Sequence, residues 1–274
     1  MKQILQTSST IPAKTVLLAT ISLCCFVACT GGTPAGVEET RDVNAVDSIL
    51  KRLGQTSMGL KSYQAKIKHT FSQPLLDSET VRRGRLYYKK EAESSKVRLD
   101  FETLKQDDAK EQAYREQILF DGVWLVRIDY QLKRAEYRQL AEPNSPMKAL
   151  DLANGYLPIA GLTKIEDLKK RFDIALITQF SSKSKEPIHL RLQAKTGSGY
   201  KEAYSAIDLW LGTKPFLPTR IVYKSSQDET EVWEFHNQNI KKKLSDSIFQ
   251  VEIPDGFSKN VIELKQTATR KPRQ

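Results

Sequence analysis

Cysteine is scarce and is confined to one end of the chain. The 274 residues contain three cysteines, Cys24, Cys25 and Cys29. The residues beyond Cys29 can therefore form no internal disulfide, thiol nucleophile or thiolate metal site. Their stability must come from a packed core. About 246 residues follow position 28, which is enough to bury such a core in one domain.

Histidine is equally scarce, and no familiar catalytic motif occurs. His69, His189 and His236 fall in separate predicted strands without metal-ligand spacing. Asp107 and Asp108 stand side by side in a charged stretch, and such neighbours do not by themselves face one substrate. We find no nucleophile elbow, phosphate-binding loop or zinc signature. The sequence therefore predicts a protein that is not an enzyme and has no cofactor or metal, with a hydrolase as the outside alternative.

The first apolar run is too short to cross a bilayer, which takes roughly 20 apolar residues. Residues 1–14 contain Lys2 and Lys14 and no acidic residue, and the run that follows, residues 15–28, is apolar or small. A basic head, a short apolar run and small residues at its end are typical of a secretory signal peptide. We expect residues 1–28 to be such a peptide; a buried first helix is the alternative.

The run ends at Phe26-Val27-Ala28-Cys29. This resembles the lipobox of bacterial lipoproteins, with Phe26 where Leu is usual, and implies that Cys29 becomes the lipidated first residue. Gly, Thr and Pro in residues 30–36 indicate a flexible tether, which we place at 29–41. We therefore expect a cell-envelope protein, anchored by lipid at the outer membrane and facing the periplasm. Ordinary cleavage with release into the periplasm is the alternative.

The charge is basic but mixed. The net charge is +10, and Lys2 and Lys14 account for two of it, which leaves +8 beyond the signal. The basic residues are spread among acids, as in residues 183–186, which is typical of solvated strand faces. An anionic membrane surface or an acidic partner is the alternative, and an exported protein is not expected to bind nucleic acid. Residues 265–274 form a basic tail.

Alternation of apolar and polar residues dominates the chain after residue 61. It is cleanest in residues 188–194, and it is typical of antiparallel strands with one wet face. An Asp121-Gly122 turn divides one apolar stretch into two strands. We expect strands at 63–71, 84–89, 96–101, 118–126 (two strands), 134–140, 172–180, 188–194, 203–211, 217–224, 229–239 and 249–253.

Three segments have helical spacing instead. Residues 42–53 form the first helix and end at Gly54; residues 145–155 start at a Ser145 cap; residues 163–172 start with a capping box. Because no strand-helix-strand rhythm appears, we do not expect a parallel nucleotide-binding sheet. The sequence predicts a mainly β fold in one domain over 42–264. We expect an incomplete antiparallel β-barrel of about 11–12 strands, with helices packed in or over its concave face.

The order of these segments resembles the LolA/LolB-like carriers of bacterial outer-membrane lipoproteins. The resemblance covers most of residues 42–264 and is carried by residues 118–125, 146–156, 216–221 and 249–257. It implies an apolar cavity under a helical lid that binds acyl chains without chemistry. It also implies an arginine early in the sheet that latches the lid, for which Arg98 is the positional match. The anchored branch of the family presents an apolar residue from a loop after the third strand, whereas the matching loop here, 103–116, is highly charged.

A curled sheet with two short helices as cover would leave apolar wall uncovered, which is a ligand pocket by default. We therefore expect the partners to be acyl chains of lipoproteins or lipids. An alternative is a periplasmic sensor or scaffold that binds a protein partner through a polar convex face. The cavity wall is predicted to comprise Ile67, Leu86, Leu99, Phe101, Phe120, Leu190 and Leu192, and the underside of the lid Met147, Leu150 and Tyr156.

Overall fold

The computed structural model describes residues 43–148, 165–178, 186–198 and 204–264. The chain divides into two compact units, Met1–Gly36 and Val37–Gln274, and every described residue belongs to the second. Cys29, Leu150 and Tyr156 lie outside the described residues. None of the helices within these ranges is long and apolar enough to cross a membrane.

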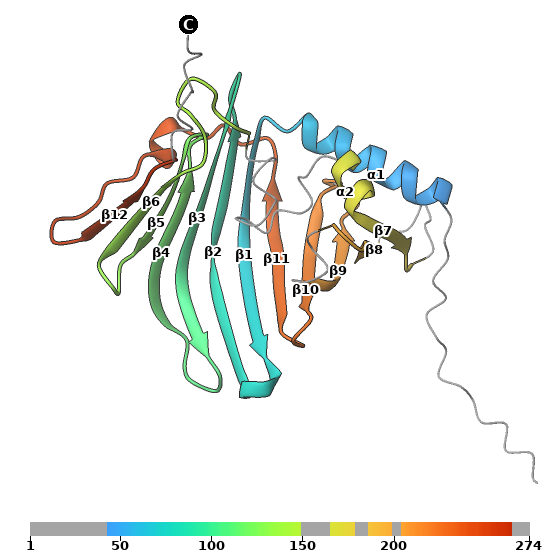
Figure 1. Ribbon diagram of the computed structural model, residues 1–274, viewed down its shortest axis with the longest axis horizontal. Coiled ribbons are helices and arrows are strands. Elements are labelled where there is room, and N and C mark those ends of the chain that lie inside the picture. The colour runs from blue at the N-terminus through green and yellow to red at the C-terminus, as the bar shows by residue number, and fades with distance from the viewer. Residues whose placement is uncertain (1–42, 149–164, 179–185, 199–203, 265–274) are drawn as a thin grey trace, which may run out of the picture. The chain divides into compact units, whose positions relative to one another are not determined.

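The described residues form one sheet of twelve strands (Figure 1). The strands are β1 (Ser62–Gln73), β2 (Ser78–Lys90), β3 (Ser95–Gln106), β4 (Gln112–Phe120), β5 (Trp124–Asp129), β6 (Arg134–Gln139), β7 (Phe172–Leu176), β8 (Ile188–Ala194), β9 (Tyr204–Leu211), β10 (Pro218–Ser225), β11 (Thr230–Asn239) and β12 (Ser258–Ile262). Their order across the sheet is β12-β6-β5-β4-β3-β2-β1-β11-β10-β9-β8-β7.

Two meanders make this order. Strands β1 to β6 follow one another on one side, β7 to β11 do so on the other, and the antiparallel pair of β1 and β11 joins them, with Ile67 opposite Phe235. Strand β12 extends the sheet beyond β6 and is parallel to it. The two outermost strands, β12 and β7, do not pair with each other, so the sheet stays open. The expected mainly β fold, an incomplete antiparallel barrel, is confirmed.

One face of the sheet, which we call the inner face, carries most of the core. Alternation puts every second side chain on this face, so neighbouring strands contribute to one continuous apolar layer. The helix α1 (Val43–Met58) adds Val46, Ile49, Leu50 and Leu53 to the same core. Buried inner-face residues include Ala65, Ile67, Leu86, Leu99, Phe101, Phe120, Leu190, Leu192, Leu209, Ile221 and Trp233.

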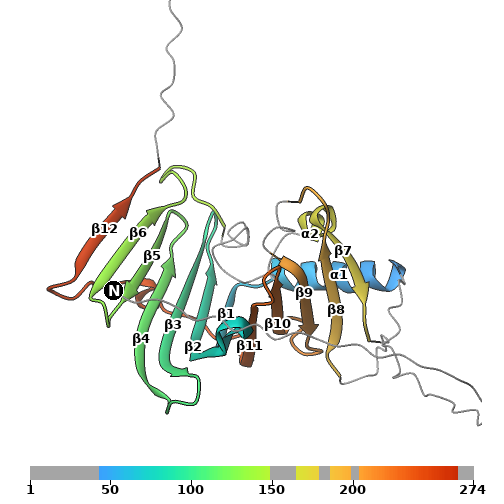
Figure 2. The same cartoon turned by 60° about the horizontal axis from the view of Figure 1, so that its bottom comes forward.

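Helix α1 lies beside β7 and the short helix α2 (Ile165–Arg171) in both views (Figure 1 and Figure 2). Lys169 of α2 pairs with Asp47 of α1 at 2.7 Å. The expectation that α1 ends at Gly54 is wrong, because the helix runs on to Met58. The backbone N–H of Gly59 donates to the carbonyl of Gln55, and burial of Leu53 and Ser57 outweighs the weak helix propensity of a glycine.

The opposite face, the outer face, has a second and smaller core over β4, β5 and β6. Leu119, Val126, Ile128 and Ala135 pack there against Leu244 and Phe249 of the segment after β11. This segment contains a 3-10 turn, η4 (Asp246–Phe249). The expected strand over 249–253 is therefore wrong. Its apolar residues pack on the outer core without pairing to a strand, and the last strand of the chain is β12.

The structure of residues 103–116 and of the segment that begins at Ser145 differs from expectation. The charged stretch 103–116 is mostly strand, since β3 reaches Gln106 and β4 begins at Gln112, and Leu104 and Tyr114 lie in these strands. The first residues of the expected helix at 145–155 are not helical. Ser145 forms a bridge with Glu142, and the N–H of Met147 donates to the carbonyl of Gly122.

Candidate functional site

The structure places all seven residues predicted for the cavity wall on the inner face. Each of them is at most 3% exposed, and all belong to one core cluster. Among the described residues we find hollows of about 410, 260 and 530 Å³, and of the seven only Phe101 lines any of them. The predicted wall is thus a packed surface, and a guest could reach it only by displacing the chain that covers it.

The three residues predicted for the lid are described only in part. Met147 is half-buried and packs against the inner core, next to the Asp121-Gly122 turn whose carbonyl it binds. Leu150 and Tyr156 lie outside the described residues, so the lid stays a prediction.

Arg98 lies on the outer face, because its neighbours Val97 and Leu99 point to the inner one. Its Nε donates to Asp100 at 2.8 Å, and its Nη1 donates to the carbonyl of Ile248 at 2.6 Å. These contacts hold the segment after β11 on the outer core. The expected role as a lid latch over the inner face is corrected: in a strand, a shift of one position moves a side chain to the other face.

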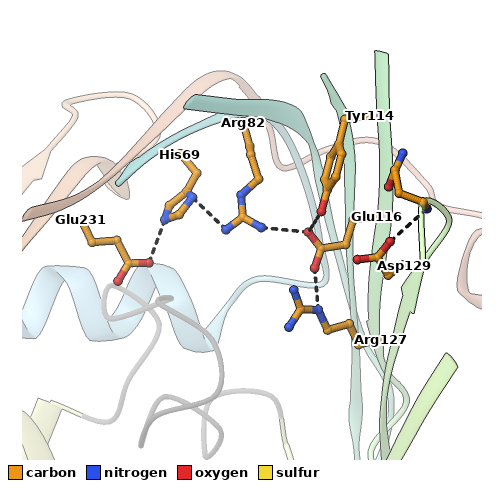
Figure 3. Close-up of polar contacts among 8 residues, drawn as sticks. His69, Arg82, Tyr114, Glu116, Arg127, Asp129 and Glu231 are labelled. Atoms are coloured by element: carbon orange, nitrogen blue, oxygen red, sulfur yellow. Dashed lines mark hydrogen bonds and ion pairs between the residues drawn. The ribbon is translucent and has the colours of Figure 1, made fainter. Parts of the chain in front are cut away.

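A row of polar groups crosses the inner face at one end of the apolar layer, and no motif indicated it. We call it the polar band; it comprises His69, Arg82, Tyr114, Glu116, Arg127 and Glu231 (Figure 3). The residues come from β1, β2, β4, β5 and β11. Strand pairing brings them together, since Glu116 lies opposite Phe101 and His69 opposite both Arg82 and Trp233.

Glu116 is the centre of the polar band and is fully buried. Arg82 Nη1 donates to its Oε2 at 2.8 Å, Arg127 Nε donates to its Oε1 at 2.6 Å, and the Tyr114 hydroxyl donates to Oε2 at 3.0 Å (Figure 3). A buried carboxylate is tolerable only when it is paired and hydrogen-bonded in this way. Asp129, also in Figure 3, instead accepts the N–H groups of Gln131 and Leu132 and closes the turn after β5.

The hydrogen bonds of the polar band assign the tautomer of His69. Arg82 Nη2 lies 3.1 Å from His69 Nδ1, and a guanidinium can only donate, so Nδ1 accepts. The proton then resides on Nε2, which donates to Glu231 Oε1 at 2.9 Å. Trp233 Nε1 donates to the same oxygen at 2.9 Å, and the Arg82 guanidinium lies 4.5 Å over the Phe101 ring. Polar and aromatic groups are thereby interlocked across the boundary of the apolar layer.

The charges of the band shift two pKa values. Burial would raise the pKa of Glu231, but the hydrogen bond from His69, the Trp233 donor and the charge of Arg82 together lower it below its ordinary value. Burial and the adjacent Glu116 carboxylate raise the pKa of Tyr114 to about 12. Tyr114 is therefore a hydrogen-bond donor at neutral pH, and Glu231 is ionised.

We expect the lowered pKa of Glu231 to make the stability of the fold depend on acid pH. A carboxyl whose pKa is lower in the folded state stabilises the fold above its unfolded pKa of roughly 4.3, and this contribution is lost as the pH falls through the folded value. The wild type should therefore exceed Glu231→Gln in free energy of unfolding at pH 7, and the difference should shrink toward pH 3. Urea unfolding at a series of pH values measures it.

The exposed Glu93, which lies outside the band, offers the control Glu93→Gln. That variant should follow the wild type at every pH. A difference between wild type and Glu231→Gln that stays constant from pH 7 to pH 3 would contradict the assigned role of the ionised carboxylate.

Chemically, the band can donate and accept hydrogen bonds at the edge of an apolar layer. Within the described part of the chain, no three metal-binding side chains come together. His189 lies on the outer face and binds the buried Asp208 at 2.9 Å, and Asp208 also accepts from Arg191. His236 is exposed near the end of β11.

Comparisons with known proteins find similar folds among solved structures. No family model matches the sequence, and no curated protein matches it. Solved structures with a similar fold include an uncharacterised protein from Thermus thermophilus (12% identity, TM-score 0.47, 80% of this chain and 99% of that one). They also include MucB in complex with MucA from Pseudomonas aeruginosa (13%, 0.42, 76% and 61%). A third is a LolA superfamily protein from Nitrosomonas europaea (15%, 0.35, 75% and 97%).

Proposed function

We propose that this protein holds the acyl chains of lipoproteins or other lipids at its inner face, without catalysis. It does so as a protein anchored through Cys29 at the outer membrane, facing the periplasm. The observation that carries the proposal is the inner face itself. It is a continuous apolar layer over both meanders, and it is bordered at one end by the polar band.

The two parts of this face suit the two parts of a lipid. Methylene groups gain about 0.8 kcal/mol each when they are buried, so one acyl chain could contribute on the order of 10 kcal/mol before costs. The polar band offers the remaining N–H donors of Arg82 and Arg127 at the edge of that layer, where the ester or amide oxygens of a lipid would lie. Because the wall residues are at most 3% exposed, uptake requires the inner core to open.

Two matched cavity variants test the proposal. Leu99 belongs to the inner core and is 3% exposed, whereas Ile128 belongs to the outer core and is 0% exposed. Truncation of either to alanine should cost about 2 to 5 kcal/mol of stability. The cavity left by one such truncation is too small for a sixteen-carbon chain. Binding of a fluorescent sixteen-carbon fatty acid therefore reports that the apolar layer of the inner face has opened. We expect Leu99→Ala to bind more of the probe than the wild type, and Ile128→Ala to match the wild type.

Equal binding by both variants, or no binding by any of the three proteins, would contradict the proposal. Mass spectrometry of the full chain from an envelope fraction adds a second measurement, since it reports both acylated Cys29 and co-purified lipid. The alternative, a sensor or scaffold that binds a protein partner through the outer face, predicts that none of the three proteins binds the probe.

A further inference from the structure

A hollow of about 530 Å³ lies at one end of β9, β10 and β11, away from the polar band. Trp210, Arg220 and Glu234 line it from the outer face, since their strand neighbours Leu209, Leu211, Ile221, Trp233 and Phe235 belong to the inner core. Lys214 lines it from the connection between β9 and β10. Pockets of this size bind small molecules or lipid headgroups.

The hollow carries an excess of positive charge. Glu234 is already paired with Lys68 at 2.9 Å. Among the described residues, Lys214 and Arg220 have no carboxylate partner, and the Arg220 guanidinium lies over the Trp210 ring at 5.1 Å from its centroid. The other side of that indole stacks on His189, with ring centroids 4.1 Å apart. The indole therefore positions Arg220 in the hollow that Lys214 also lines, and both cations border one concave surface.

A buried acceptor is the second feature of the hollow. Gln238 Nε2 donates to the carbonyls of Pro218 at 2.8 Å and Phe235 at 3.3 Å, which fixes the amide. Its Oε1 is buried and has no hydrogen-bond partner among the described residues. An unpaired buried acceptor costs about 1 to 3 kcal/mol, and this cost disappears when a ligand donates to it. Because Gln238 lines the hollow, its acceptor suits a ligand that carries a hydroxyl or an N–H donor.

We propose that this hollow binds a hydroxyl-bearing phosphate of the glycerol phosphate type. The phosphate would lie between Lys214 and Arg220, because ammonium and guanidinium groups make charge-assisted hydrogen bonds to phosphate oxygens. A hydroxyl of the ligand would donate to Gln238 Oε1, and a second would donate to Glu234. The site goes beyond the proposed acyl-chain function, since it lies on the other face of the sheet and does not depend on it.

The test measures binding to the full-length protein by calorimetry. The probes are glycerol 3-phosphate, inorganic phosphate and a short-chain, soluble phosphatidylglycerol, with the matching phosphatidylcholine as the reference. The variant Lys214→Gln with Arg220→Gln removes both cations. The control, Lys51→Gln with Arg134→Gln, removes the same charge from two exposed residues elsewhere. We expect the first variant to lose at least about tenfold in affinity and the control to bind as the wild type does.

The arms of the experiment separate two sources of the ligand. Binding of glycerol 3-phosphate with an affinity equal to that of phosphatidylglycerol supports a free solute, and binding of phosphatidylglycerol alone supports a lipid headgroup. Inorganic phosphate should bind more weakly than glycerol 3-phosphate, because it leaves Gln238 Oε1 unpaired. No binding by any phosphate probe, or equal losses in the variant and its control, would overturn the proposal whether or not the inner face binds acyl chains.

Discussion

Glu116→Gln is expected to lower the free energy of unfolding by about 2 to 3 kcal/mol. The amide keeps the shape of the side chain, but it removes the negative charge that two arginines share at the edge of the inner core. It also turns one acceptor into a donor that faces Arg82 or Arg127. The loss of charge compensation is larger for Arg82 than for Arg127. The Arg82 side chain is 22% exposed and is less hydrated than that of Arg127, which is 57% exposed. Urea unfolding followed by circular dichroism measures the loss.

Glu102→Gln is the matched control for that experiment. Glu102 pairs with Arg85 at 3.3 Å, and both side chains are about half exposed, at 52% and 48%. Pairs of this kind contribute little, so the control should change stability by less than about 0.5 kcal/mol. If the two substitutions cost the same, Glu116 is not the electrostatic centre that we describe.

Gly84→Ala is expected to cost about 3 kcal/mol or more, the range of severe overpacking. A Cβ on Gly84 would lie 1.8 Å from the Asp100 carbonyl oxygen and 2.8 Å from the Cα of Phe101. Both are backbone atoms, which no rotamer change can move. Strands β2 and β3 would have to separate where a bulge between Arg83 and Gly84 sets the register. Thermal and urea unfolding should both show the loss.

Gly197→Ala separates this steric effect from the effect of any added methyl group. Gly197 has a φ of +77° and nothing within 4 Å of an added Cβ, so only backbone strain of about 1 to 2 kcal/mol is expected there. A loss at Gly84 no larger than the loss at Gly197 would show that β2 and β3 have room to part.

Alternation predicted most of the sheet because most strands have one dry face, whereas β12, which is exposed along its length, was not predicted. Residues 188–194 are the clearest example, since Ile188, Leu190 and Leu192 are all buried and the residues between them are not. The same reasoning brought the seven wall residues to one face. It did not reveal that they are packed, because a pattern in one strand says nothing about what covers it.

The errors arose where packing overrides local signals. Gly54 is a common helix terminator, yet α1 continues for one more turn, in which Ser57 is buried. Residues 249–253 have the composition of a strand, but they lie flat on the outer core and do not pair. Arg98 was assigned by position along the chain, and a shift of one residue separates the two faces of a strand.

The polar band was missed for a reason that the sequence partly shows. His69 follows Ile67 in the same alternating series, and Glu116 precedes Ile118 and Phe120 in another, so both are polar residues at inward positions. The charges around Glu116 predict a loop, which hides its inward position. A carboxylate at an inward position indicates that it needs partners elsewhere in the sheet. It does not indicate which residues these partners are. Only the pairing of β1, β2, β4, β5 and β11 supplies them.

The joining of the two meanders through β1 and β11 has a consequence for biogenesis. Strand β1 can meet β11 only when the ribosome has added some 160 residues after it, because His69 and Trp233 are paired neighbours. Contacts between such distant segments form slowly. Until β11 is available, the first six strands therefore expose the unpaired edge of β1, which is a site for aggregation. The nascent chain should need a chaperone until Asn239 has emerged, and truncation before β11 should yield aggregates and no stable half-sheet.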